Sequence, residues 1–294
     1  MRSGAAGVSA VGVAGASWAG SRVVGFVGPV SGAGKTTAAV MSAHAAAGQL
    51  AGPVTVVDLD PDPGLLRARL TAVPSPPAVL ELVNALPGPF GVGSVNELLA
   101  HVGPAGQIRV AHKDGAPAAD VRDLSVMQWS AVLDRLAGVA PLVLADGGVS
   151  LVSPAAEALW DRADHLVIAV RADVAEIALT CQLLSNRRQT HLHLLAGASV
   201  VMVMEDRPSA LVRQGIRWFE SNCARVVPVR WDRVLSGSGR IDVGRVAPSS
   251  RAAYGQITTH FIEVFSAAAA ASESESAAGN LATGPVPVVG PAAP

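Results

Sequence analysis

The stretch GPVSGAGKTT at residues 28–37 decides the fold. The apolar run RVVGFV at residues 22–27 precedes it and predicts a buried strand, and the Ala-rich segment at residues 35–47 predicts a helix. Strand, glycine-rich turn and helix in this order form the context in which such a loop binds phosphate. The alternative is a glycine-rich turn that contains Gly-Lys-Thr without holding an anion.

The loop has the groups that a nucleotide phosphate needs. Gly32 and Gly34 allow the backbone to curl so that successive N–H groups point inward, and the positive end of the following helix faces the same anion. Lys35 supplies a charge for the β and γ phosphates, Thr36 a hydroxyl for Mg²⁺, and Thr37 can reach the α-phosphate side. The predicted nucleotide-binding residues here are Ser31, Gly32, Ala33, Gly34, Lys35, Thr36 and Thr37.

The rest of the chain continues the alternation of strand and helix. Further apolar runs predict strands at residues 54–59, 142–145, 166–170, 200–203 and 226–229. Helical patterns lie between and after them, at residues 125–136, 154–162, 174–187, 209–220 and 248–265. Continuous apolar strands alternating with helices predict an α/β fold: a mainly parallel sheet with helices on both faces, the three-layer arrangement of P-loop nucleotide-binding proteins.

Composition sets the expected domain boundaries. We expect residues 1–20 to be a flexible leader and residues 21–265 to form one nucleotide-binding domain. Within that domain, residues 72–119 are rich in Pro and Gly and form an excursion with one helix-like piece at residues 95–101. Residues 266–294 are low-complexity Ala, Ser, Gly and Pro, which predicts a disordered tail because such a segment buries too little apolar surface to offset its ordering entropy.

Charge and cysteine content exclude several classes of protein. The formal net charge is −1, which predicts no strong overall attraction to nucleic acid or membrane. The two cysteines, Cys181 and Cys223, form no disulfide framework, which favours a cytoplasmic protein. No apolar run approaches the ~20 residues of a membrane-spanning helix, and the tail lacks a basic amphipathic segment. The five tryptophans are scattered and predict packing in the core or at its rim.

Acidic residues follow two of the predicted strands. Asp58 and Asp60 stand in the segment VTVVDLDP at residues 54–61, and Asp146 ends the apolar run of PLVLADGG at residues 141–148. A carboxylate at the carboxyl end of a strand lies at the crevice where α/β sheets bind ligands. An Asp beside the loop also fits the position that supports the Mg²⁺ of a nucleotide. The alternative for Asp60 is an Asp-Pro turn that ends the strand.

The segment SGAGKTT at residues 31–37 resembles the deviant Walker A loop of the ParA/MinD superfamily, commonly written KGGxGKTT. The resemblance covers roughly residues 21–265. The family's signature lysine falls at position 30, where this chain has Val30. In the family that lysine reaches across a nucleotide-sandwich dimer to the partner's phosphates, so its absence bears on ATP-driven dimer catalysis. Bacterial tyrosine kinases of the same superfamily also lack it.

The resemblance implies roles for particular residues. Lys35 and Asp60 would be catalytic, with Asp60 positioning the attacking water. Thr36, Asp58 and Asp146 would support the metal. Asp206 and Arg207, after the strand at residues 200–203, are the candidates for contact with the base, and the segment that begins at Pro228 resembles one that touches base and ribose. Arg171 follows the strand at residues 166–170, where relatives have loops near the dimer face, and a solvated loop residue is the alternative.

These expectations combine into a function. The chain would bind ATP with Mg²⁺, hydrolyse it slowly, and use the ATP and ADP states to hold or release a protein partner in partition, positioning or assembly of a cellular machine, such as a secretion or conjugation apparatus. Two alternatives stand for the homodimer: one that ATP joins with Arg171 as the cation for the γ-phosphate, or no such dimer, which we favour. The alternative is a non-catalytic nucleotide-binding adaptor. Residues 187–251 carry eleven Arg and five acidic residues, which fits either a non-specific DNA surface or a solvated face, and we favour the second.

Overall fold

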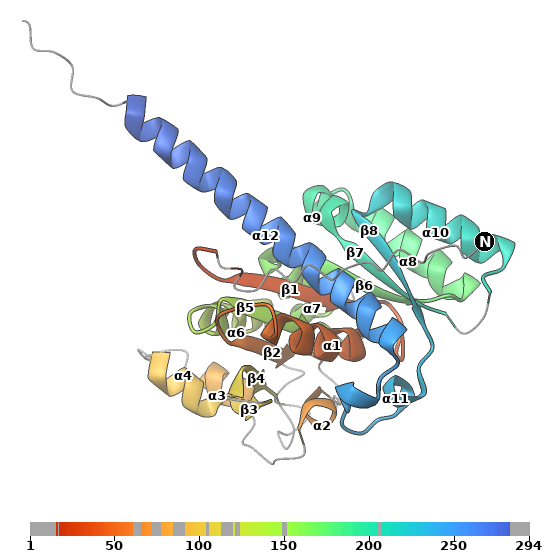
Figure 1. Ribbon diagram of the computed structural model, residues 1–294, viewed down its shortest axis with the longest axis horizontal. Helices are drawn as coiled ribbons and strands as arrows, with labels where there is room; N and C mark the ends of the chain where they lie inside the picture. The colour runs from red at the N-terminus through yellow and green to blue at the C-terminus, as the bar shows by residue number, and fades with distance from the viewer. Residues whose placement is uncertain are drawn as a thin grey trace, which may run out of the picture.

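The chain folds around an eight-stranded sheet with the strand order β3-β4-β2-β5-β1-β6-β7-β8 (Figure 1). The structure is a computed structural model, and it describes residues 16, 18–60, 66–71, 78–84, 92–103, 106–112, 120, 124–148, 152–204 and 207–282. The strands are β1 (Arg22–Val27), β2 (Val54–Asp58), β3 (Ala100–Val102), β4 (Ile108–Ala111), β5 (Leu142–Asp146), β6 (His165–Arg171), β7 (Ser199–Met204) and β8 (Arg225–Arg230). Every neighbouring pair is parallel except β3 with β4, which confirms the mainly parallel sheet.

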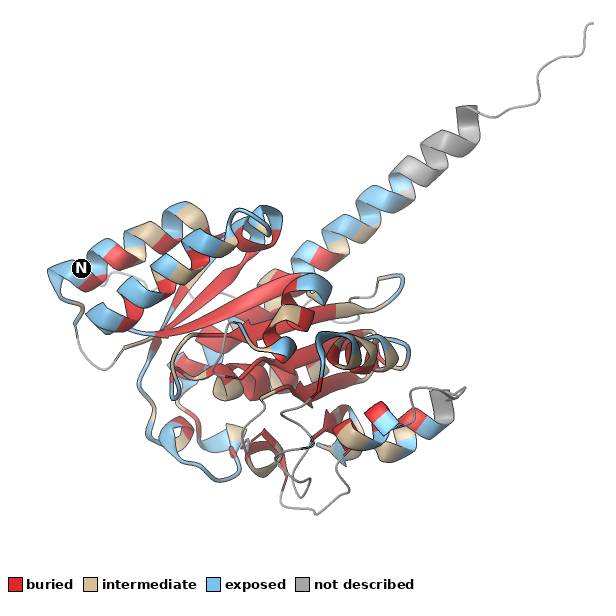
Figure 2. Cartoon of the chain, turned by 180° about the vertical axis from the view of Figure 1, so that it is seen from behind, coloured by how far each residue is buried: buried red, intermediate tan, exposed pale blue. Residues whose placement is uncertain are grey.

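Helices cover both faces of this sheet because its strands are apolar on both sides. All residues of β2 and β5 are buried. Alternate side chains of β1 point to opposite faces of the sheet. Val24 and Phe26 pack in the layer of α1 (Lys35–Ala47), α2 (Leu66–Leu70) and α12 (Pro248–Ala282). Val23 and Val27 pack in the opposite layer. That layer contains α3 (Ala78–Asn84), α4 (Val92–Leu98), α6 (Val126–Ala137), α7 (Pro154–Arg162), α8 (Val174–Arg187), α9 (Leu192–Gly197) and α10 (Ala210–Asn222). Figure 2 shows the buried sheet between the two layers.

The connections place a crevice at the carboxyl edge of the sheet. From β1 the chain passes through α1 to β2, on one side of β1, whereas β6 pairs with β1 on its other side. Ligands of open α/β sheets bind outside the carboxyl ends of the strands where the direction of winding reverses in this way. The register brings Asp58 directly opposite Asp146 at this edge, and Arg171 opposite Val203. Residues far apart in sequence therefore meet beside the loop that follows β1.

Most predicted elements are confirmed, and the segment at residues 72–119 needs a correction. Helices α1, α7 and α8 have the predicted bounds. Instead of one helix-like piece at residues 95–101, the segment contains two helices, α3 and α4, and the antiparallel strands β3 and β4. Most hydrophobic side chains of α3 and the first residue of β4 are buried, so these described parts of the excursion pack onto the domain despite its Pro and Gly content.

The last helix is longer than the sequence pattern predicts. Helix α12 continues past Phe265 to Ala282, through a segment expected to be disordered, and projects from the domain (Figure 1). The extension is rich in Ala, which has the highest intrinsic helix propensity, so it forms a helix without needing a packed face. Phe265 is the last residue of α12 whose described side chain is buried. Residues 283–294 lie outside the described part of the chain.

Two residues of the expected leader contact the domain. Ala16 forms a bridge with Leu50, and the Trp18 indole donates a hydrogen bond to the Pro141 carbonyl at 3.2 Å. The Trp18 ring also meets Phe265 of α12 edge to face. No helix in the described ranges is long and apolar enough to span a membrane.

Candidate nucleotide-binding site

A cavity of about 1110 Å³ opens at the carboxyl edge of the sheet. The loop between β1 and α1 forms one end of it, and the segment that follows β8 forms the other. Its volume slightly exceeds the roughly 300–1,000 Å³ typical of small-molecule sites. Among the described residues, five cationic side chains line it: Lys35, Arg69, Arg171, Arg207 and Arg230. Four carboxylates line it too: Asp60, Asp146, Asp173 and Asp232. This mixture of charges suits a large anionic ligand that binds together with a cation.

The glycine-rich loop has the backbone that phosphate binding requires. Gly32 and Gly34 have positive φ values of 76° and 98°, a region that glycine reaches without strain. Gly34 is also the residue before the first turn of α1, and among the described residues no side chain caps this helix end. The N–H groups of the first turn are thus available to an anion, to which the helix also presents its positive end. Ala33 is buried between the two glycines and supports the turn rather than lining the cavity.

Lys35 lies in the loop with its charged end turned back toward the backbone. Its side chain is buried, and its Nζ donates a hydrogen bond to the Val30 carbonyl at 2.9 Å. Burial lowers the pKa of Lys35, while the nearby charges of Asp146 and Asp60 act in the opposite direction. A phosphate would compensate the buried ammonium more fully than a carbonyl does.

Gly28, which directly follows β1, has a packing role. A Cβ at Gly28 would lie 2.5 Å from the Ala169 carbonyl oxygen of β6. The close approach of β6 therefore leaves no room for a side chain at position 28. Gly32 and Gly34 supply the turn of the loop.

Thr36 and Asp146 meet as the sequence predicts. The Thr36 hydroxyl donates a hydrogen bond to the Asp146 carboxylate at 2.5 Å, and Asp146 is almost fully buried. Asp58, also buried, is directly opposite Asp146 on the adjacent strand. Magnesium prefers such hard oxygen ligands and is usually held by one or two carboxylates together with substrate phosphates. The described residues contain no cluster of three or more His, Cys, Asp or Glu that could hold a metal alone, so this donor set fits an ion shared with a nucleotide.

Asp60 lies at the mouth of the cavity with its backbone fixed. Its N–H donates to the Asp58 carboxylate at 3.1 Å, and its side chain is part of the cavity wall. Gly148, which follows β5, packs directly on it: a Cβ at Gly148 would lie 2.9 Å from the Asp60 Cα. The structure thus gives a reason for glycine at position 148, because a side chain there would displace Asp60.

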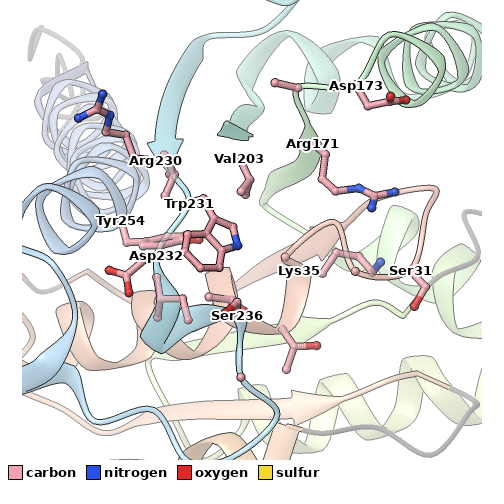
Figure 3. A pocket seen from close by; sticks show the side chains of 18 of the residues that line it. Ser31, Lys35, Arg171, Asp173, Val203, Arg230, Trp231, Asp232, Ser236 and Tyr254 are labelled. Atoms are coloured by element: carbon pink, nitrogen blue, oxygen red, sulfur yellow. The ribbon is translucent and has the colours of Figure 1, made fainter. Parts of the chain in front are cut away.

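Arg171 also reaches the cavity, at the end of β6. Its Nε donates to the Glu176 carboxylate at 2.6 Å, and its backbone N–H donates to the same carboxylate at 2.9 Å. Glu176 is buried, whereas the Arg171 side chain is 50% exposed. This ion pair fixes the direction of the guanidinium, which Figure 3 shows above the loop that carries Ser31 and Lys35.

Sequence reasoning missed Arg69. This arginine of α2 is only 5% exposed, and it donates to the Thr37 hydroxyl at 3.0 Å and to the Leu235 carbonyl at 2.7 Å. It donates further to the Gly237 carbonyl, so it ties the phosphate loop's helix to the segment after β8. Burial lowers the pKa of Arg69. No motif surrounds this residue in the sequence, and only the fold brings it to the cavity.

Part of the cavity wall is apolar or aromatic, formed by Val203, Val212, Val229, Trp231, Leu235 and Tyr254. Arg207 also lines the cavity, while Asp206 lies outside the described residues. Trp129 and Trp160 are buried as expected, but Trp231 stands in the cavity and is 51% exposed. Its place in the segment that begins at Pro228 was the one sequence signal that could have identified it.

The fold is similar to that of several proteins of known structure, although no protein-family model and no curated protein matches the sequence. A ParA family ATPase from Chlorobium tepidum aligns with a TM-score of 0.69 and 17% identity over 82% of this chain and 99% of its own. The complex of McdA from Cyanothece with ATP has a TM-score of 0.60 and 16% identity over 82% of this chain and 96% of its own.

The septum site-determining protein MinD from Pyrococcus horikoshii, complexed with Mg-ADP, has a TM-score of 0.59 and 14% identity over 81% of this chain and 94% of its own. Likeness at such low identity shows the fold. The chain therefore has the fold of the ParA and MinD ATPases.

Proposed function

We propose that the chain binds ATP with Mg²⁺ in this cavity and hydrolyses it slowly, as a switch that controls binding of a protein partner. The observation that carries the proposal is the convergence of Lys35, Thr36, Asp60 and Asp146 on one cavity at the carboxyl edge of the sheet. These residues come from three separate loops or strand ends, so their meeting is a property of the fold. The ATP, Mg²⁺ and ADP in the structures of similar proteins support this assignment.

Each residue has a distinct part in the proposed reaction. The uncapped N–H groups after Gly34 and the ammonium of Lys35 would hold the β and γ phosphates. Thr36, Asp146 and Asp58 would hold the Mg²⁺, which neutralises phosphate charge when bound. Asp60 would orient a water toward the γ-phosphorus. The guanidinium of Arg171 would face the charge that develops during transfer.

The competing proposal, an adaptor that binds nucleotide without hydrolysing it, differs only in the use of Asp60. Gly148 makes room for Asp60, so glycine at this position supports placement of the carboxylate beside the cavity. We therefore favour hydrolysis. The partner would be released or captured when the γ-phosphate is lost, since this is the group that the loop and Asp60 surround.

A single-turnover assay tests the proposal. Excess protein is mixed with radiolabelled ATP and Mg²⁺, with and without DNA, and phosphate release is compared with that of Lys35→Ala, which reports contaminating activity. We expect slow release by the wild type above this background. Tight ATP binding without release above background would support the adaptor, and failure to bind ATP would reject both functions.

A further inference from the structure

A second, smaller cavity lies in the segment that runs from α11 (Arg233–Ser236) to the turn before α12. Its volume is about 450 Å³, within the roughly 300–1,000 Å³ typical of small-molecule sites. Among the described residues, its lining consists of Arg233, Val234, Gly237, Gly239, Arg240, Asp242 and Arg245. Only Gly237 also lines the nucleotide cavity, so the two cavities are distinct.

The lining of this second cavity is strongly cationic. Arg233, Arg240 and Arg245 are all exposed, and none of them forms an ion pair within the part of the chain that the structure describes. The one carboxylate among the described lining residues, Asp242, accepts a hydrogen bond from the Gly244 N–H at 3.1 Å. Guanidinium groups that share a cavity repel one another, so an anion between them relieves this repulsion.

The core holds the backbone of the segment, and with it the positions of the arginines. Each of the three arginines is one or two residues from a buried side chain, namely Leu235, Ile241 or Val246. The Ile241 N–H donates to the Arg69 carbonyl at 2.9 Å, and the Arg69 guanidinium donates to the Leu235 carbonyl at 2.7 Å. The segment is thus attached to α2 at two points, which lowers the entropy cost of placing the arginines around a ligand.

Two glycines keep the wall between Arg233 and Arg240 open. A Cβ at Gly239 would meet no atom within 4 Å, and a Cβ at Gly237 would meet only the Val234 carbonyl, at 3.9 Å. The absence of side chains at these two positions lets a ligand approach the backbone closely.

We infer that this cavity is a second anion site, which takes a small molecule carrying a di- or triphosphate group. A guanidinium can bind phosphate oxygens through two parallel hydrogen bonds, so three arginines around one cavity suit a ligand with more than one phosphate. The volume fits a small molecule, and the net charge of −1 gives the chain no strong overall attraction to nucleic acid. The inference does not rest on the proposed function, because no residue of the phosphate loop takes part.

Isothermal titration calorimetry with sodium pyrophosphate tests the inference on the full chain, with Mg·ADP present at a concentration that fills the nucleotide cavity. We expect the wild type to bind one pyrophosphate. Arg240→Gln should bind it at least about tenfold more weakly, because hydrogen bonds to a charged group are lost. The double variant Arg240→Gln/Arg245→Gln should lose binding altogether. Both side chains are exposed, so the variants should keep the melting temperature of the wild type.

Arg217→Gln is the matched control, because Arg217 is an exposed arginine of α10 outside both cavities. It should bind pyrophosphate as the wild type does, and so should Lys35→Met, which changes only the phosphate loop. The inference is overturned if the wild type binds no pyrophosphate, if Arg240→Gln binds it normally, or if binding is lost in Lys35→Met instead. Duplex DNA that displaces pyrophosphate and binds more tightly would also overturn it, because the arginines would then belong to a nucleic-acid surface.

Discussion

Asp60 shows at the residue scale how backbone geometry places a functional carboxylate. Its N–H is held by Asp58, and the absence of a side chain at Gly148 leaves the space that it occupies. A group that only orients water contributes in the transition state and little to the binding of substrate. If Asp60 has the proposed role, its removal lowers the rate of ATP hydrolysis without lowering the affinity for ATP.

We predict that Asp60→Ala retains ATP affinity and loses turnover by about ten- to a thousandfold. Equilibrium binding of a fluorescent ATP analogue and single-turnover hydrolysis measure the two quantities on the same protein. Asp161→Ala is a suitable control, because Asp161 is an exposed carboxylate outside the cavity. A parallel fall in affinity and turnover would assign Asp60 to the metal or to the structure of the loop.

The sequence predicts a site residue where a short motif around that residue marks it. Lys35, Thr36 and Asp146 each stand in a short motif directly after a predicted strand, and parallel strands end at one edge, so their meeting could be predicted. Arg69 has no such motif, and the one sequence signal for Trp231 is its place in the segment that begins at Pro228. Arg69 reaches the cavity from the five-residue helix α2, and the exposure of Trp231 follows from where β8 ends relative to β7.

At the scale of elements, the contact between β6 and α12 contains a buried imidazole. His165 of β6 hydrogen-bonds with the Ser199 hydroxyl at 3.1 Å and packs against the rings of His260 and Phe261. Burial, assisted by the nearby charge of His260, lowers the pKa of His165 to about 3. The folded protein therefore excludes a proton that the unfolded chain binds below its usual pKa of about 6.5. This difference destabilises the fold as the pH falls from that value toward 3.

We predict that His165→Gln reduces the loss of unfolding free energy between pH 7 and pH 4 by roughly 2–3 kcal/mol. Gln keeps a hydrogen-bonding partner for Ser199 but does not titrate. Urea unfolding across this pH range measures the effect, and His193→Gln, at an exposed position, is the control. Equal pH dependence in the wild type and His165→Gln would show that this imidazole does not cause the acid sensitivity.

Helix α12 divides into a packed half and an exposed extension. Tyr254, Phe261 and Phe265 belong to the core, and beyond Phe265 each described side chain is exposed or only partly buried. We predict that removal of residues 266–294 leaves the melting temperature and nucleotide affinity nearly unchanged. By contrast, Phe261→Ala should cost about 3–5 kcal/mol of stability. Calorimetry on both variants checks this, and a drop of several degrees on truncation would show that the tail docks on the domain.

The elements themselves were predictable to different degrees. The strands β1, β2 and β5 to β7 are continuous apolar runs, because they are covered on both faces, and this pattern is strong in sequence. The strands β3 and β4, at one end of the sheet, are short and lie in a segment rich in Pro and Gly, where the pattern is weak. The extension of α12 depends on the helix propensity of Ala rather than on an apolar stripe. The apolar periodicity of the helix stops at Phe265, so a prediction based on that periodicity ends the helix there.

For the whole molecule, the open question is whether ATP joins two copies. The lysine that serves this purpose in the family is replaced by Val30, an apolar residue whose carbonyl accepts from Lys35 within the same loop. Arg171 is the cation that the ion pair with Glu176 holds above the loop. Exposed apolar side chains also follow the carboxyl edge, with Met127 and Leu211 at the first turns of α6 and α10.

We predict that the wild type forms no stable ATP-dependent dimer and hydrolyses ATP very slowly, because loss of a charge aimed at a transferring phosphoryl group can raise the reaction barrier by several kcal/mol. Val30→Lys should gain ATP-dependent dimerisation and faster turnover. Light scattering with ATP and with ADP measures the mass of the wild type, Val30→Lys and Arg171→Ala. A wild-type dimer that is lost in Arg171→Ala would show that Arg171 replaces the lysine. A wild-type dimer that survives this change would contradict both expectations.

The central claim is that the loop of Gly32 to Thr37 holds the phosphates of a nucleotide, and Lys35 tests it most directly. Equilibrium binding of a fluorescent ATP analogue to Lys35→Met, which keeps the apolar stem without the charge, should be weaker by about a hundredfold or more. Arg162→Ala, which removes a cation from a surface ion pair with Asp134, should bind normally. A folded Lys35→Met protein with the affinity of the wild type would contradict the account.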